Sequence, residues 1–204
     1  GISLTSNATT DTLTFSATSD SSLGVVYAKH YGLDASKTDG TNVTAINNAI
    51  AALGDDGGTI FFPGGQFYLN ASIDITRANA TNSIRFVGSG HQNYGGDPTQ
   101  NKSATPPVYG DVGGTVLRRD QDNEFFNITN SRAIHFIGIT FKGGSATSTG
   151  GNSGVSGGSG AITVNADPGC QGYLFENLVF HGIKNCLTLN GFCLLYTSPS
   201  PRDL

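Results

Sequence analysis

The chain has 204 residues, of which 29 are glycine and only 13% are charged, and its formal net charge is −4. Because Lys and Arg form no run, the composition argues against nucleic acid and anionic membranes as partners, both of which need basic patches. No apolar stretch approaches the length of a membrane span, and no signal-peptide pattern is present. Abundant Gly, Ser and Thr favour short strands and tight turns over long helices.

The two ends of the sequence differ from its middle. No Met occurs anywhere, so we expect the first residue to be internal to a longer protein. Residues 193–204 lose the strand pattern and resemble a translated sequencing adapter, so we expect a non-native tail without function. A genuine Pro-rich linker is the alternative. Cys170 and Cys186 are then the native cysteines, and two buried free thiols are favoured over a bridge between them, without settling the redox compartment.

Residues 1–22 predict a small β-hairpin. Apolar and polar residues alternate over 2–5 and over 13–16, and residues 7–11 supply the turn. A hairpin of this size has little core of its own, so it needs a partner or neighbouring chains. The segment resembles short β-modules of phage tail fibres, which implies a virion origin and a homotrimer.

Residues 25–69 predict one helix followed by two strands. Apolar side chains share one helical face over residues 42–53, and Gly54 provides the stop. Residues 59–62 and 66–69 have strand composition, with a Pro-Gly-Gly turn between them.

These elements carry a specific resemblance. The succession of Tyr31-Gly32, Asp39-Gly40-Thr41, the helix and the Gly57–Tyr68 segment resembles the N-terminal part of the pectate-lyase-like superfamily, including rhamnogalacturonase-like, epimerase-like and phage tailspike types. The resemblance implies an all-β fold, a right-handed parallel β-helix solenoid whose N-terminal α-helix caps the open end. The family commonly has acidic residues after Asp-Gly, whereas this chain has Asn42, which counts against a local ion site.

The second half of the chain repeats itself. Residues 134–143 align with 173–182, and residues 84–88 form a third, partial copy, as expected of a solenoid. Phe136, Ile139 and Phe141 should then lie above Phe175, Leu178 and Phe180. A β-sandwich, the main rival, would show plain alternation and hairpin turns.

The predicted organisation has three parts. Residues 1–22 form the tail-fibre-like segment, residues 23–192 the truncated β-helix, and residues 193–204 the adapter-derived tail. Two long inserts, 91–114 and 145–160, interrupt the predicted coils, and loops of such length are functional or flexible.

The densest acidic group provides the catalytic candidates. A glycoside hydrolase needs two carboxylates, and a lyase needs a base together with Ca²⁺ or an Arg. The candidates are Asp120, Asp122 and Glu124, which follow Arg118 and Arg119. A polar turn whose charges pair with one another is the favoured alternative. An EF-hand is excluded because Phe125 stands where Gly is required, so no metal ligand is assigned.

Five further side chains are candidates for sugar contact. Aromatic rings can pack against sugar faces, and outward polar residues at matching repeat positions could line a groove. The candidates are His91, Tyr94 and Tyr109 in the first insert, and Lys142 and His181 at equivalent positions of two repeats. Ordinary packing and solvated surface are the favoured alternatives.

Two classes of function follow from the resemblance. One is an extracellular or virion-associated enzyme, a polysaccharide lyase or glycoside hydrolase. The other is a non-catalytic tail-fibre module that adheres to a cell-surface glycan. No polygalacturonase-type signature is present, and the family's active sites lie on middle coils. We therefore expect this chain to lack a complete active site and to carry no cofactor, with Ca²⁺ relevant only to a lyase.

Overall fold

The structure is a computed structural model that describes residues 2–7, 12–17, 24–77, 82–90, 114–119, 124–143, 161–165, 170–183, 185–190 and 193–194. These residues are mostly β-strand, and all their sheets but one are parallel. The exception is an antiparallel pair formed by β1 (Ile2–Asn7) and β2 (Thr12–Ala17). The hairpin predicted for residues 1–22 is therefore present.

Three parallel sheets make up the body of the described chain, and we name them B, C and D. Sheet B contains, in spatial order, β3 (Val25–Tyr27), β4 (Gly58–Phe61), β7 (Ile84–Val87), β10 (Ile134–Ile137) and β14 (Leu174–Glu176). Sheet C contains β5 (Gly65–Tyr68), β8 (Thr115–Arg119), β11 (Ile139–Gly143) and β15 (Val179–His181). Sheet D contains β6 (Ile73–Thr76), β9 (Phe126–Thr129), β12 (Ile162–Asn165) and β16 (Leu187–Asn190).

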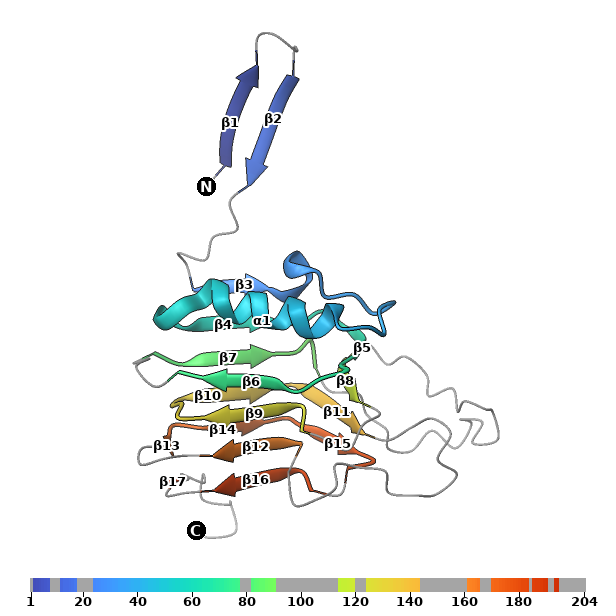
Figure 1. The fold of residues 1–204 in the computed structure, drawn as a ribbon, viewed down its shortest axis with the longest axis vertical. Coiled ribbons are helices and arrows are strands. Elements are labelled where there is room, and N and C mark those ends of the chain that lie inside the picture. Colours follow the sequence, from blue (N-terminus) through green and yellow to red (C-terminus); the bar gives the residue numbers. More distant parts are fainter. Residues whose placement is uncertain are drawn as a thin grey trace, which may run out of the picture.

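The chain passes through the three sheets in the same order each time. From β4 onward it runs B, C, D four times, and from the second pass each strand pairs with its counterpart from the pass before. Figure 1 shows the resulting stack of layers. Because β10–β14 and β11–β15 pair in parallel, the hairpins expected of a β-sandwich are absent from these two blocks.

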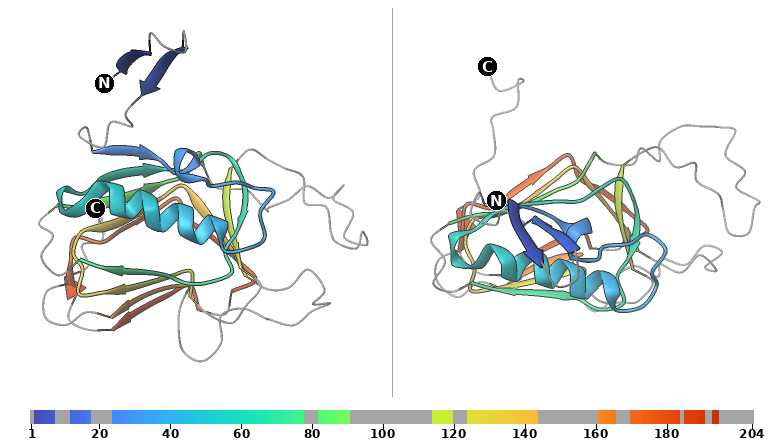
Figure 2. Two further views of the ribbon diagram at one scale, coloured as in Figure 1. Left: turned by 45° about the horizontal axis from the view of Figure 1, so that its top comes forward. Right: turned by 90° about the horizontal axis from the view of Figure 1, so that it is seen from above.

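The predicted helix is α1 (Thr41–Leu53), which begins one residue before the expected start. It is preceded by η2 (Ala28–Tyr31) and followed by η3 (Gly54–Asp56). Figures 1 and 2 show α1 lying across the β3–β4 end of the stack. Ala45, Ile46 and Ala49 are at most 1% exposed, so the helix covers apolar side chains that would otherwise face water.

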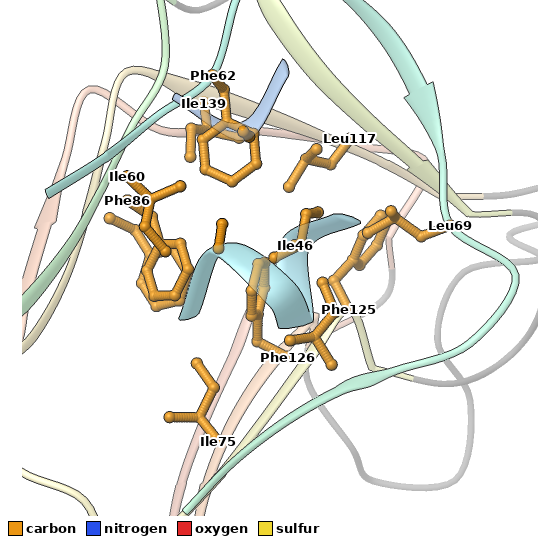
Figure 3. Packing of buried hydrophobic residues seen from close by; sticks show 14 of the residues in the cluster. Ile46, Ile60, Phe62, Leu69, Ile75, Phe86, Leu117, Phe125, Phe126 and Ile139 are labelled. Atoms are coloured by element: carbon orange, nitrogen blue, oxygen red, sulfur yellow. The ribbon is translucent and has the colours of Figure 1, made fainter. Parts of the chain in front are cut away.

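Aromatic side chains at equivalent positions stack along the core (Figure 3). The ring of Phe136 lies 5.0 Å from that of Phe86 and 6.1 Å from that of Phe175, nearly parallel to both. Phe141 and Phe180 stack in the same way at 5.3 Å. The predicted alignment of residues 134–143 with 173–182 and 84–88 is therefore correct in register.

Glycine is required where the first two layers meet. Gly58 has φ of +135°, and a Cβ there would collide with the backbone carbonyl of Gly24. That carbonyl accepts a hydrogen bond from the amide of Thr59 at 2.7 Å. The Gly-Gly-Thr sequence thus lets β4 pair closely with β3.

The last described layer corrects one prediction. Cys186 is free, as predicted, but it is exposed rather than buried. Its backbone carbonyl accepts from the amide of Ile162 in the preceding layer. No described strand of sheet D packs beyond β16, so apolar positions there keep contact with water. Leu187 is 37% exposed, whereas its register partner Ile162 is fully buried.

The predicted tail begins with a short pairing. β17 (Cys193–Leu194) pairs in parallel with β13 (Cys170–Gln171), so the first two residues of the 193–204 segment contact the preceding layer. Residues 195–204 lie outside the described residues. In the described part of the chain, no helix has both the length and the apolar character needed to cross a bilayer.

Candidate functional site

The outer face of sheet C carries a column of cationic and aromatic side chains. Strand alternation points Phe67, Leu117 and Phe141 into the core, where each is at most 2% exposed. The residue after each inward side chain therefore points outward. These residues are register partners from one strand to the next, and they form the cationic column: Tyr68, Arg118, Lys142 and His181.

A cavity adjoins the upper end of the cationic column. Its volume is about 330 Å³, at the small end of the range for small-molecule sites. It is lined by Ala35, Thr38, Gln66, Tyr68 and Arg118. Tyr68 and Arg118 belong to both features, so the cavity and the column form one continuous candidate site.

A buried asparagine holds the loop that forms one wall of this cavity. Asn42, at the start of α1, is fully buried. Its Oδ1 accepts from the amide of Asp34 at 2.9 Å, and its Nδ2 donates to the carbonyls of Lys37 at 3.3 Å and Tyr68 at 3.1 Å. The neutral side chain of Asn42 therefore ties loop, helix and β5 together.

Local hydrogen bonds keep the two carboxylates of this loop ionised. The amide of Ser36 donates to Asp34, and the amide of Thr41 donates to Asp39. The pKa of each carboxyl lies below its usual value, chiefly through the amide of Ser36 for Asp34, and through the hydroxyl and then the amide of Thr41 for Asp39. A carboxyl held ionised is a poor general acid, so neither residue is a candidate proton donor.

Burial and a neighbouring cation both act on His181. Partial burial, and then the nearby ammonium of Lys142, lower the pKa of this histidine. His181 is therefore neutral at pH 7, and the positive charge of the cationic column comes from Arg118 and Lys142. A neutral imidazole can both donate and accept hydrogen bonds.

The two arginines of the predicted acidic cluster have different surroundings. Arg118 lines the cavity, whereas Arg119 is only 1% exposed. Burial lowers the pKa of Arg119, and the carboxylate of Glu124 opposes that effect. Glu124 therefore acts electrostatically on Arg119, away from the cavity lining.

The remaining catalytic and sugar-contact candidates divide into two sets. Lys142 and His181 are brought together on one outer face, as predicted. Glu124 lies among the described residues, but neither of the other two candidate carboxylates does. Five candidates lie outside the described residues: His91, Tyr94, Tyr109, Asp120 and Asp122.

Sequence reasoning missed the cavity, although one signal for part of it was present. Tyr68 and Arg118 each follow an inward apolar residue, the same step that singled out Lys142 and His181. Aligning residues 65–68 and 115–118 with the recognised repeats would have placed all four side chains in one column. Nothing in the sequence indicated that Ala35 and Thr38 would reach this face.

Sheet C is also the sheet that both long inserts adjoin. The 91–114 insert precedes β8 along the chain, and the 145–160 insert follows β11. Among the described residues, no three His, Cys, Asp or Glu side chains gather into a possible metal site. A comparison with protein-family models, curated proteins and solved structures finds no match for this chain.

Proposed function

We propose that this chain is the N-terminal part of a right-handed parallel β-helix of the pectate-lyase-like type, and that it binds or depolymerises a polysaccharide. Two features support the architecture. The chain passes repeatedly through the same three parallel sheets in register, and a helix covers the first layer. In such a solenoid a helix of this kind caps the stack.

The observation that carries the proposed function is the continuity of the cavity with the cationic column. Side chains suited to sugar recognition lie close together where the cavity meets the cationic column. The ring of Tyr68 offers an apolar face and a hydroxyl, the amide of Gln66 can donate and accept, and Arg118 can bind a carboxylate in a bidentate manner. A polymer lying across the strands from the cavity would meet Lys142 and His181 in turn.

Binding has more support among the described residues than cleavage does. Arg118 or Lys142 could stabilise the anion formed in a lyase reaction. A hydrolase needs two carboxylates, and only Glu124 of the candidate acids is described. No cluster among the described residues fits Ca²⁺. We propose that a complete catalytic site requires Asp120, Asp122 or side chains from further coils.

The second candidate function is non-catalytic adhesion to a glycan by a phage tail fibre or tailspike. The β1–β2 hairpin favours it, because an isolated two-stranded hairpin is marginal in water and gains stability from a partner. This version includes a homotrimer and a virion-associated or extracellular location. Sedimentation of the full chain tests it, since a monomer with an ordered hairpin would count against the tail-fibre version.

Affinity electrophoresis tests the proposed site. The full chain is run through gels containing polygalacturonate, alginate, bacterial capsule material or dextran, and the variants are Tyr68→Ala and Arg118→Ala. Arg85→Ala is the matched control, because Arg85 is exposed on sheet B. We expect at least one polymer to retard the wild type. The affinity for that polymer should be at least about tenfold weaker in the site variants and unchanged in the control. Equal retardation of all variants would refute this site.

An activity assay tests whether this chain alone is catalytic. The same polymers are incubated with the chain, with and without Ca²⁺, and new reducing ends and the ultraviolet absorbance of unsaturated uronates are measured. Neither signal is expected from this chain alone. If one appeared, Asp120→Asn and Asp122→Asn would be the first substitutions to test.

A further inference from the structure

The outer face of sheet D has a different chemistry from that of the other sheets. Every outward position on its four strands is Asn, Asp or Thr: Asp74, Thr76, Asn127, Thr129, Thr163, Asn165, Thr188 and Asn190. We call these residues the amide–hydroxyl face. Thr163 is only 5% exposed, so the other seven side chains form the accessible surface. Sheet B carries Arg85 and His135 at its outward positions, and sheet C carries the cationic column. The amide–hydroxyl face has no cation and one carboxylate, and it is turned away from sheet C (Figure 2).

A directional ladder of hydrogen bonds runs across this face. Nδ2 of Asn190 donates to Oδ1 of Asn165 at 2.9 Å, and Nδ2 of Asn165 donates to Oδ1 of Asn127 at 3.1 Å. Nδ2 of Asn127 then donates to Oδ1 of Asp74 at 3.1 Å. An ionised carboxylate can only accept, so Asp74 fixes the direction of every amide in the ladder.

The ladder orients hydrogen-bonding groups toward solvent. Each asparagine uses one of its two Nδ2 hydrogens in the ladder, and the amide oxygens of Asn127 and Asn165 each accept one ladder bond while having two lone pairs. Outward groups therefore recur at the strand spacing of about 4.8 Å. Thr76 and Thr129, which are register partners, add hydroxyls beside the ladder.

Stability alone gives a weak reason for this arrangement. All three ladder bonds are exposed, and water competes for exposed amides, so each bond adds little net stability. The bonds favour one orientation of the four side chains before any ligand arrives, and an array that is already oriented lowers the entropy cost of binding.

We propose that the amide–hydroxyl face binds a neutral, hydroxyl-rich glycan chain lying across the strands. Sugar hydroxyls both donate and accept, which matches a face of oriented amides and threonine hydroxyls. Without a cation to offset Asp74, the face disfavours a polyanion. The site lies on a different sheet from the cavity and the cationic column, so the inference does not rest on the function proposed above.

The test uses the full chain and removes hydroxyls without disturbing the strands. Thr76→Val combined with Thr129→Val keeps side-chain shape and strand preference, and Thr59→Val on sheet B is the matched control. Affinity electrophoresis is run with dextran, mannan, xylan and galactan as neutral probes and polygalacturonate as the acidic probe. Circular dichroism confirms that each variant is folded.

We expect at least one neutral polymer to retard the wild type and the Thr59 variant equally, with binding about tenfold weaker in the double variant. Replacing Asn165 by Leu should weaken the same binding through loss of the ladder. Failure of all four neutral polymers to retard the wild type would overturn the proposal. Retardation only by polygalacturonate would overturn it as well.

Discussion

The side-chain Nδ2 of Asn42 donates to the backbone carbonyl of Tyr68 at 3.1 Å and so joins α1 to the strand that lines the cavity. The two residues are 26 positions apart. Because Asn42 also binds the loop at Asp34 and Lys37, one buried amide positions both the cap and a wall of the candidate site.

Replacing Asn42 by Asp should destabilise the fold. The carboxylate would lose both N–H donors and face the carbonyls of Lys37 and Tyr68 in a fully buried site. We expect a loss of about 2–4 kcal/mol in the free energy of unfolding at pH 7, measured by urea denaturation. Asn47→Asp, at an exposed position of the same helix, is the control. Equal effects of the two substitutions would contradict the role given to Asn42.

Substitutions in the stacked aromatic core should lower the stability of the fold most at the centre of the stack. Phe136 is fully buried and contacts the rings of Phe86, Phe126 and Phe175. Its replacement by Ala should cost about 3–5 kcal/mol. Phe175→Ala should cost less, because Phe175 is only partly buried in the last described layer. Chemical denaturation of both variants checks this order, and a larger loss at Phe175 would show that more structure covers that end.

Arg77 should stabilise the C-terminal end of α1. Its guanidinium donates from Nη2 to the carbonyl of Gly54 at 2.7 Å and from Nη1 to that of Asn82 at 3.0 Å. Arg77→Met should cost about 1.5–3 kcal/mol, since both carbonyls lose a charged donor. Hydrogen exchange should accelerate around residues 50–56. Exposed Arg85→Met should change neither quantity, and unchanged exchange in the Arg77 variant would count against this contact.

The repeated core could be read from the sequence, whereas the candidate site could be read only in part. Phe136 and Phe175 lie in blocks whose spacing is the same, so alignment alone places one above the other. The cavity depends on Asn42 meeting Tyr68 across 26 residues, and no local pattern encodes that contact. The burial expected for Cys186 was wrong because burial needs a covering layer. Ala161, one layer earlier, is fully buried, while Cys186 is not.

Histidine protonation should make the fold less stable as pH falls below neutrality. Partial burial is the main cause that lowers the pKa of both His181 and His135 from the usual value of 6.5. The hydrogen bond to the Gly172 carbonyl opposes this shift for His135, and the cations of Lys142 and Arg85 add to it. The unfolded chain then binds more protons than the folded chain below that value. Stability should therefore decrease as pH falls from about 7.5 to 5.

Substitution of these histidines measures that effect directly. His135→Gln combined with His181→Gln should flatten the dependence of the unfolding free energy on pH between about 5 and 7.5, and each single variant should remove part of it. Asp34 and Asp39 do not interfere, because their lowered pKa values place their titration at more acidic pH. Denaturation curves at matched ionic strength provide the measurement. A double variant with the same slope as the wild type would show that burial of these two rings does not govern the acid sensitivity of the fold.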